Sequence, residues 1–246
     1  MIRSKTTILL FFSSLGLNLT AIIYAIYRGI NRLDFARYYK EGYFLTNLST
    51  LHLLIISFLC FYLYSLKRKY IKANSSKNKG KPIIWIILCF GFLFLGIDEQ
   101  FMVHESIDIF THNLMESIFN YQGNSITKRL DDIVVLLYFI FGVWMINKYK
   151  EEIILFNNGK SYLRLGLILT LIMITLDIST SQNDLFSLIF PRENVNYVIK
   201  VFGVIEDSIK LFALTFFSAW LGSCISIVKK KVFTNPKMIL SKSKLN

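Results

Sequence analysis

Cysteine and proline are scarce in this sequence of 246 residues, which holds three of each. All three cysteines, Cys60, Cys89 and Cys224, lie inside apolar runs, and none has the CxxC spacing of a metal site. We therefore expect small buried side chains rather than a disulfide framework. The sequence also lacks a glycine-rich phosphate-binding loop and a GxSxG element, so it contains no motif for nucleotide binding or for a serine hydrolase of that type.

Acidic residues are also few, with 16 Asp and Glu against 28 Lys and Arg, which gives a formal net charge of +12. A strongly basic chain is a candidate for nucleic-acid binding. The placement of the charges argues against that function, because Lys and Arg cluster between apolar runs instead of interleaving with aromatic residues on a soluble domain. We expect no nucleic-acid partner, and we expect membrane lipids to surround the chain.

Long apolar runs dominate the sequence, 54% of which is hydrophobic. Runs of about 18 or more apolar residues are typical of helices that cross a bilayer. The sequence predicts an all-α, polytopic transmembrane bundle in a single domain, residues 1–231, followed by a basic cytoplasmic tail at 232–246. The last span exceeds what a bilayer core of about 30 Å requires, so part of it must tilt or project. The predicted spans are approximately 7–27, 43–66, 82–102, 131–147, 162–180 and 198–228.

The distribution of charge predicts which ends of the spans face the cytoplasm. With a cytoplasmic N-terminus, the cytoplasmic segments hold 19 Lys and Arg and the outer segments hold eight. Because positive charge accumulates on the cytoplasmic side, we expect both termini to be cytoplasmic. Of the 16 acidic residues, only Glu151 and Glu152 then lie on the cytoplasmic side. Acidic residues contribute little to topology, so this bias indicates an acidic site at the outer edge of the membrane.

The stretch FLGIDEQFMVHESIDIFTH, residues 94–112, continues directly from the third apolar run. On a continuous helix that includes Asp98, five ionisable residues share an arc of about 120°. The pattern predicts an amphipathic outer helix, which either extends the third span or lies separately on the membrane surface. The ionisable residues are Asp98, His104, Glu105, Asp108 and His112, and the opposite stripe consists of Val103, Ile107, Phe110, Leu114 and Ile118.

Histidine and carboxylate side chains in this stretch are candidate metal ligands or acid–base groups. His104 and Asp108 are four residues apart, the spacing at which two helical side chains can hold one ion. With Asp98 and with Asp177 of the fifth span, they form the predicted ligand set for a divalent metal, zinc or manganese, and Glu105 is the predicted general base. The alternative is that these residues are only the solvated face of an interfacial helix. The segment HESID has Asp108 where a zinc protease of the HExxH type needs a second histidine, which argues against that class.

Charged residues also lie inside the last apolar run, in the segment IEDSIKLF. Ionisable groups within a span usually face the bundle interior or a water-filled cavity. We predict an intramembrane charge pair among Glu206, Asp207 and Lys210, in which Glu206 and Lys210 have the i, i+4 spacing that allows them to pair. The group is either a structural ion pair, part of a proton or ion relay, or a substrate-facing site.

The segment LGIDEQFMVHE, followed late in the chain by IEDSIKLF, resembles a group of uncharacterised bacterial multispanning membrane proteins with an Asp-Glu-x4-His-Glu segment. The resemblance implies that acidic and histidine residues of the two segments belong together, and it implies no particular activity. We expect the protein in the bacterial cytoplasmic (inner) membrane. The residues concerned are Asp98, Glu99, His104, Glu105, Glu206 and Asp207.

These features predict a membrane protein of unknown specific activity with an outer-facing site of acidic and histidine residues. The leading hypothesis is a metal-dependent hydrolase or transferase that acts on a lipid-type substrate. One alternative is an ion-coupled transporter in which Glu206, Lys210 and Asp177 line a cavity, although we find no inverted repeat and few Gly or Pro breaks. The other alternative is a non-catalytic structural or accessory membrane subunit.

Overall fold

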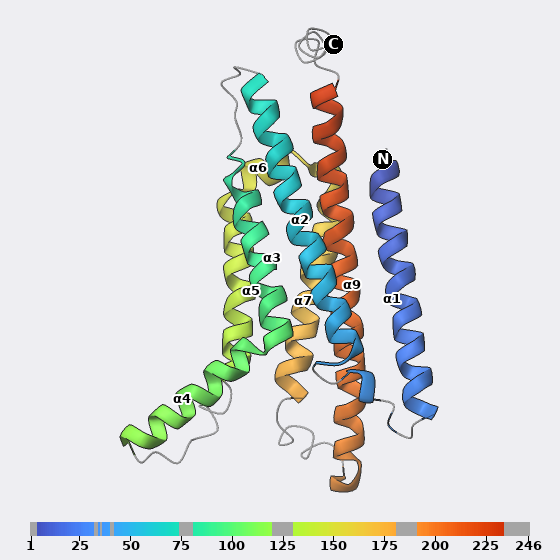
Figure 1. Cartoon of the computed structure of the whole chain (residues 1–246), viewed down its shortest axis with the longest axis vertical. Helices are drawn as coiled ribbons and strands as arrows, with labels where there is room; N and C mark the ends of the chain where they lie inside the picture. The colour runs from blue at the N-terminus through green and yellow to red at the C-terminus, as the bar shows by residue number, and fades with distance from the viewer. Residues whose placement is uncertain are drawn as a thin grey trace.

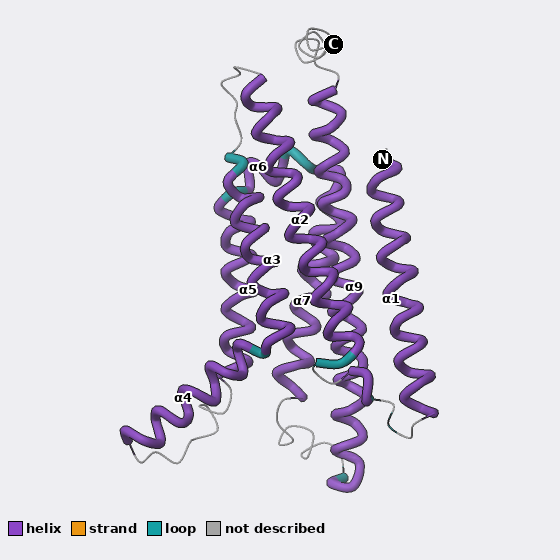
Figure 2. Tube along the Cα trace, viewed as in Figure 1, coloured by secondary structure: helices purple, strands orange, loops and turns teal. Residues whose placement is uncertain are grey.

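The computed structural model describes residues 4–31, 34, 36–39, 42–73, 81–119, 130–180 and 191–233, and all regular structure within these ranges is helical (Figure 2). Of the predicted tail at 232–246, the first two residues end the last helix and the others lie outside the described residues. The elements are α1 (Lys5–Asn31), η1 (Arg37–Tyr39), α2 (Phe44–Ala73), α3 (Ile83–Phe101), α4 (Val103–Phe119), α5 (Leu130–Lys148), α6 (Lys150–Ile154), η3 (Asn157–Gly159), α7 (Lys160–Thr180) and α9 (Arg192–Phe233).

Five helices, α1, α2, α3, α7 and α9, are long and apolar enough to cross a membrane. A further helix, α5, has 19 residues, the same length as α3, and lies along the same axis as the others (Figure 1). The prediction of an all-α helical bundle is therefore confirmed, and the apolar helices mark the chain as a membrane protein.

The two ends of the bundle, seen in Figure 1, differ in their content of acidic residues. At the end that we call the basic end, α1 begins and α2 and α9 terminate. At the opposite, acidic end, α3 and α7 terminate and α4 extends outward. Within the described ranges, the acidic residues of the basic end are Glu151 and Glu152 of α6. The first residues of α1 and the last residues of α9 lie at the same end, as the predicted even number of spans requires.

Helix α9 is the axis of the bundle and runs along its whole length (Figure 1). It is one helix of 42 residues, about 63 Å at 1.5 Å per residue, and so extends beyond both limits of the predicted span at 198–228. Pro191 stands immediately before its first residue, a position that suits a residue without a backbone N–H. Within its most apolar window 78% is buried, against 17% for α1, so α9 forms the core and α1 the periphery.

Helix α1 packs on α9 through small and polar side chains. Asn18 is fully buried, and its Nδ2 donates to the carbonyl of Leu211 and to the hydroxyl oxygen of Thr215, both at 2.9 Å. The hydroxyls of Ser14 and Thr215 are also 2.9 Å apart. Small and hydroxylated residues at such an interface let two membrane helices approach closely and hydrogen-bond. Asn18 is the middle residue of α1, so Leu211 lies level with the centre of that helix.

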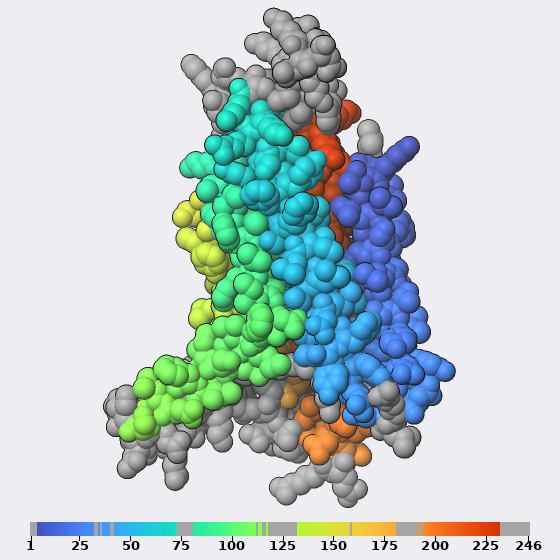
Figure 3. All heavy atoms as spheres, viewed as in Figure 1, coloured from blue at the N-terminus to red at the C-terminus, as the bar shows by residue number. Residues whose placement is uncertain are grey.

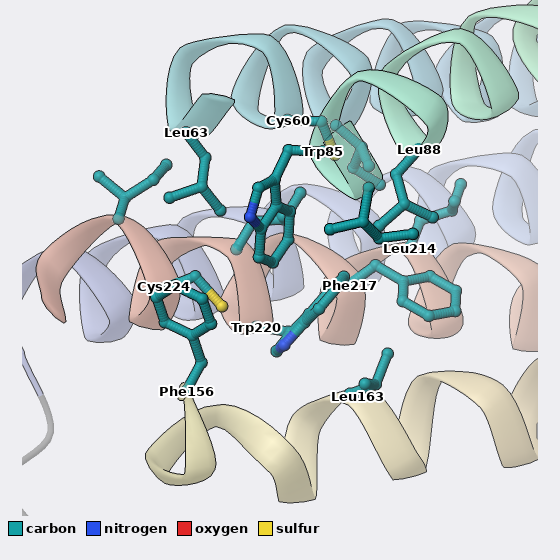
Figure 4. Close-up of a cluster of buried hydrophobic side chains, with 14 of the residues drawn as sticks. Cys60, Leu63, Trp85, Leu88, Phe156, Leu163, Leu214, Phe217, Trp220 and Cys224 are labelled. Atoms are coloured by element: carbon teal, nitrogen blue, oxygen red, sulfur yellow. The ribbon is translucent and has the colours of Figure 1, made fainter. Parts of the chain in front are cut away.

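The largest apolar core joins α2, α3, α7 and α9 to the segment between α6 and α7 (Figure 4). The rings of Trp85 and Trp220 are buried and have centroids 5.5 Å apart. Phe156 meets Trp85 edge to face at 5.4 Å, a favourable aromatic geometry. All three cysteines are free, and Cys60 and Cys224 are buried in this core as predicted, whereas Cys89 is only half-buried.

Candidate functional site

A polar network joins α2, α3 and α9 toward the acidic end of the bundle. The ammonium of Lys210 lies 2.8 Å from Oε1 of Glu99 and 2.8 Å from Oδ1 of Asp207. Ser49 of α2 donates a hydrogen bond of 2.6 Å to the same oxygen of Glu99. The side chains of the three charged residues are between 17% and 23% exposed, so the network is largely buried and still partly accessible. One lysine thus ties the end of α3 to α9.

The partner of Lys210 differs from the one that the sequence predicted. Its ammonium lies between Glu99 and Asp207 instead of forming the expected pair with Glu206. Lys210 pairs with Asp207 at the i, i+3 spacing, which allows a side-chain contact on a helix as i, i+4 does. Glu206 interacts electrostatically with several charged groups around it. Asp177, Asp207, Lys210 and Glu99 lie within electrostatic range of its carboxyl group.

A bend between α3 and α4 brings Asp98 and His104 together. Met102 ends α3 in the left-handed conformation, with φ 51°, and the chain then turns into α4. Buried Asp98 accepts a hydrogen bond of 2.9 Å from the backbone N–H of His104, and its other oxygen lies 3.0 Å from Nδ1 of the same residue. The carboxylate therefore caps the first turn of α4 and fixes the orientation of the imidazole.

This bend decides between the two predicted forms of the stretch 98–119. Residues from Val103 onward form a separate helix, whereas Asp98 belongs to α3. The predicted continuous helix that carries both Asp98 and His104 is therefore wrong. The two side chains nevertheless meet across the turn. Helix α4 extends away from the body of the molecule at the acidic end (Figure 1 and Figure 3). Three residues of its predicted apolar stripe are exposed, namely Ile107, Phe110 and Leu114. The pattern fits a helix that lies in the interface of the membrane.

The predicted metal ligands are only partly brought together. Asp98 contacts His104, whereas Asp177 lies near Glu206. Within the part of the chain that the structure describes, no group of three or more His, Cys, Asp or Glu side chains is arranged to hold a metal ion. Asp108 has a buried Oδ1 that finds no hydrogen-bond partner there. Glu105, the predicted base, is half-buried in the first turn of α4, and the side chain of His112 lies outside the described residues.

A second charged group, at the basic end, was missed by the sequence analysis. Oε1 of Glu152 lies 2.9 Å from the ammonium of Lys67 and accepts a hydrogen bond of 3.1 Å from Nε1 of Trp85. Glu152 is 1% exposed, and the ammonium of Lys67 also lies 5.3 Å from the centre of the Phe156 ring. Both charged residues come from polar stretches that flank apolar runs, so no local pattern indicates that they are buried together.

The fold and the two networks define a helical membrane protein with an acidic, histidine-containing site at one end and a buried ion pair at the other. The chain belongs to the family described as Domain of unknown function (DUF8692), which matches residues 8–224. The match begins in α1 and ends within α9, so it includes every residue of both networks. No curated protein and no solved structure matches the chain.

Proposed function

We propose that the chain is a multi-pass protein of the bacterial cytoplasmic membrane and that its acidic end faces outward. In this arrangement the six long helices α1, α2, α3, α5, α7 and α9 cross the bilayer, and both termini are cytoplasmic. The charge difference between the ends supports the orientation, because Lys and Arg gather where α2 and α9 terminate and the described acids there are Glu151 and Glu152.

At the acidic end we propose a site that binds and releases a proton or a small cation, as an ion-coupled carrier requires. The observation that carries this proposal is the sharing of Lys210 by Glu99 and Asp207, with Glu206 and Asp177 within electrostatic reach. With every group ionised, the two carboxylates that contact Lys210 and the two within electrostatic range outnumber its single positive charge. A bound proton or cation reduces that imbalance.

The depth of the site supports a role in ion movement. Lys210 immediately precedes Leu211, whose carbonyl accepts a hydrogen bond from Asn18, the middle residue of α1. Glu99 lies in the last turn of α3. The charged group therefore extends from the end of one apolar helix toward the level of the centre of another. Ionisable residues at such depth usually face a pathway for ions or protons, and carriers bind their coupling ions there.

A proton fits this site better than a multivalent metal. Among the described residues, the carboxyl groups are not gathered into a set of three that can hold a metal. The ammonium of Lys210 also occupies the position between Glu99 and Asp207, where it opposes the approach of a divalent cation. Neighbouring carboxyl groups disfavour the ionisation of one another, so a proton is the smallest ligand that relieves the repulsion.

Charge displacement after a pH step in proteoliposomes tests this function. Wild-type protein on a solid-supported membrane is expected to give a transient current as protons bind, and Glu206→Gln is expected to lose most of it. Asp34→Asn is the matched control, because Asp34 is an acid of the same end in a loose pair with Lys200 at 3.7 Å. A wild type without a transient, or a Glu206→Gln variant with an unchanged one, would contradict the proposal.

A second candidate function is favoured by the Asp98–His104 contact. A buried carboxylate that hydrogen-bonds Nδ1 of histidine orients the ring and favours a basic Nε2, an arrangement that general acid–base catalysis and metal binding both use. Half-buried Glu105 follows in the same turn, and in the proposed arrangement α4 lies along the outer membrane interface. This candidate is a hydrolase or transferase acting on a lipid-type substrate, with zinc or manganese as the metal that such a site would take.

Lipid turnover by the purified protein tests the second candidate. Vesicles of phosphatidylethanolamine and phosphatidylglycerol, supplied with zinc or manganese, are expected to yield a released headgroup or a transferred acyl group. His104→Gln is expected to lower this rate by about 100-fold or more, the contribution typical of a general base. Absence of turnover by the wild type with either metal, or an undiminished rate in His104→Gln, would remove this candidate.

A further inference from the structure

The carboxyl-terminal ends of α2 and α9 lie next to each other at the basic end. The two helices run in the same direction, and both continue beyond the start of α3 and beyond α6 (Figure 1). The ammonium of Lys229 lies 5.3 Å from the centre of the Tyr62 ring, a cation–π contact that links α9 to α2. Two neighbouring helix ends thus form one surface beyond the apolar core.

This surface carries basic residues from both helices. On α2, Arg68, Lys69 and Lys72 are exposed, whereas Lys67 turns inward to Glu152. On α9, Lys230 and Lys231 are exposed, next to Lys229. The described acids of this end, Glu151 and Glu152, belong to α6, and Glu152 is already paired with Lys67. Among the described residues, basic side chains therefore outnumber acidic ones at these helix ends.

The length of α2 places this surface in the headgroup layer of the membrane. Its 30 residues span about 45 Å, whereas the hydrocarbon core of a bilayer is about 30 Å thick and the bilayer with headgroups about 40–45 Å. The apolar part of α2 ends at Leu66, and the basic residues follow within the next two turns. On α9, the basic run likewise follows the buried Val228 directly. The charges on both helices therefore reach the depth of lipid phosphates.

We propose that the ends of α2 and α9 form a binding site for the phosphate of an anionic phospholipid. Arg68 supplies a planar guanidinium that can form two parallel hydrogen bonds to a phosphate, and the lysines supply compact positive charges beside it. The depth of these basic residues favours a lipid over a soluble partner, because they lie between the apolar core and the aqueous phase. This inference is independent of the acidic end and of the activity proposed there.

Spin-labelled lipids measure this selectivity directly. Protein in phosphatidylcholine vesicles is expected to restrict the motion of a labelled phosphatidylglycerol about fivefold more than that of labelled phosphatidylcholine, since each basic residue near the headgroups adds attraction for anionic lipid. The triple variant Arg68→Gln, Lys69→Gln and Lys72→Gln is expected to lose most of this preference, because glutamine keeps the helix propensity and removes the charge.

The matched control removes the same number of charges elsewhere at the basic end. Lys148, Lys150 and Lys160 are also exposed there, and the triple variant with glutamine at these positions is expected to retain the preference. An equal loss in the control variant would overturn a local site in favour of a diffuse basic field. A wild type without preference, or displacement of the labelled lipid by millimolar inorganic phosphate, would overturn the lipid assignment itself.

Discussion

Replacing Glu152 by alanine is expected to lower the free energy of unfolding by about 3–5 kcal/mol, the cost typical of removing one partner of a buried ion pair. Glu152 is 1% exposed, and its Oε1 forms an ion pair with the Lys67 ammonium and accepts a hydrogen bond from Nε1 of Trp85. Its removal leaves the Lys67 ammonium, on a side chain that is 9% exposed, without its carboxylate. The indole N–H of Trp85 loses its acceptor at the same time, and an unsatisfied buried donor adds to the loss.

Thermal unfolding in detergent, followed by tryptophan fluorescence, measures this effect. Glu151→Ala is the control, because Glu151 is the preceding residue of the same short helix and is exposed. Its unfolding temperature is expected to remain close to that of the wild type. The double variant Lys67→Met and Glu152→Leu is expected to recover most of the stability, since replacing both partners of a buried pair by apolar residues is often neutral. A loss in Glu152→Ala no larger than in Glu151→Ala would contradict the prediction.

The positions of the long helices could be predicted from the sequence because they depend on local composition. Each predicted span coincides with a long helix, from 7–27 within α1 to 198–228 within α9. Apolar runs of bilayer length, almost free of proline, have helix as their only stable form in lipid. The helices extend beyond the apolar runs, as at Lys229 to Lys231, because charged residues favour helix and can reach the headgroups.

The bend at Met102 could not be predicted from the same periodicity. The left-handed backbone conformation is typical of glycine and asparagine, so methionine at position 102 does not indicate a bend. A hydrogen bond from the backbone N–H of His104 to the Asp98 carboxylate spans the bend, and only the structure reveals it. The amphipathic pattern of the stretch could be predicted from its composition, whereas its division into two helices at Met102 could not.

The partners of the buried charges could also not be predicted from residue spacing within one helix. Glu99 and Lys210 are far apart in the sequence and meet only because α3 packs near α9. The resemblance of two segments implied that Asp98, Glu99, His104, Glu105, Glu206 and Asp207 belong together. In the structure Lys210 contacts Glu99 and Asp207, whereas Asp98 contacts His104. Local spacing suggested Glu206 as the partner of Lys210, but a helix offers three and four residues as equally suitable intervals.

Replacing Lys210 by alanine is expected to produce the largest loss at the acidic end, about 2–3 kcal/mol in the free energy of unfolding. This value lies between the cost of breaking a fully buried pair and that of an exposed one, because Lys210 is 23% exposed. Its removal leaves the carboxylates of Glu99 and Asp207 facing each other without the ammonium that separates them. Repulsion then adds to the loss of two charge-assisted hydrogen bonds.

Repulsion between the carboxylates of Glu99 and Asp207 predicts more than a loss of stability in Lys210→Ala. Adding Glu99→Gln and Asp207→Asn to Lys210→Ala is expected to restore part of the lost stability, because the amides no longer repel each other and can hydrogen-bond. Lys200→Ala is the control on the same helix, since Lys200 is 49% exposed and 3.7 Å from Asp34, and its expected cost is about 0–1 kcal/mol. If the triple variant unfolds at a lower temperature than Lys210→Ala, the carboxylates stabilise the bundle by themselves. Lys210 would then serve as packing and not as the charge that holds α3 to α9.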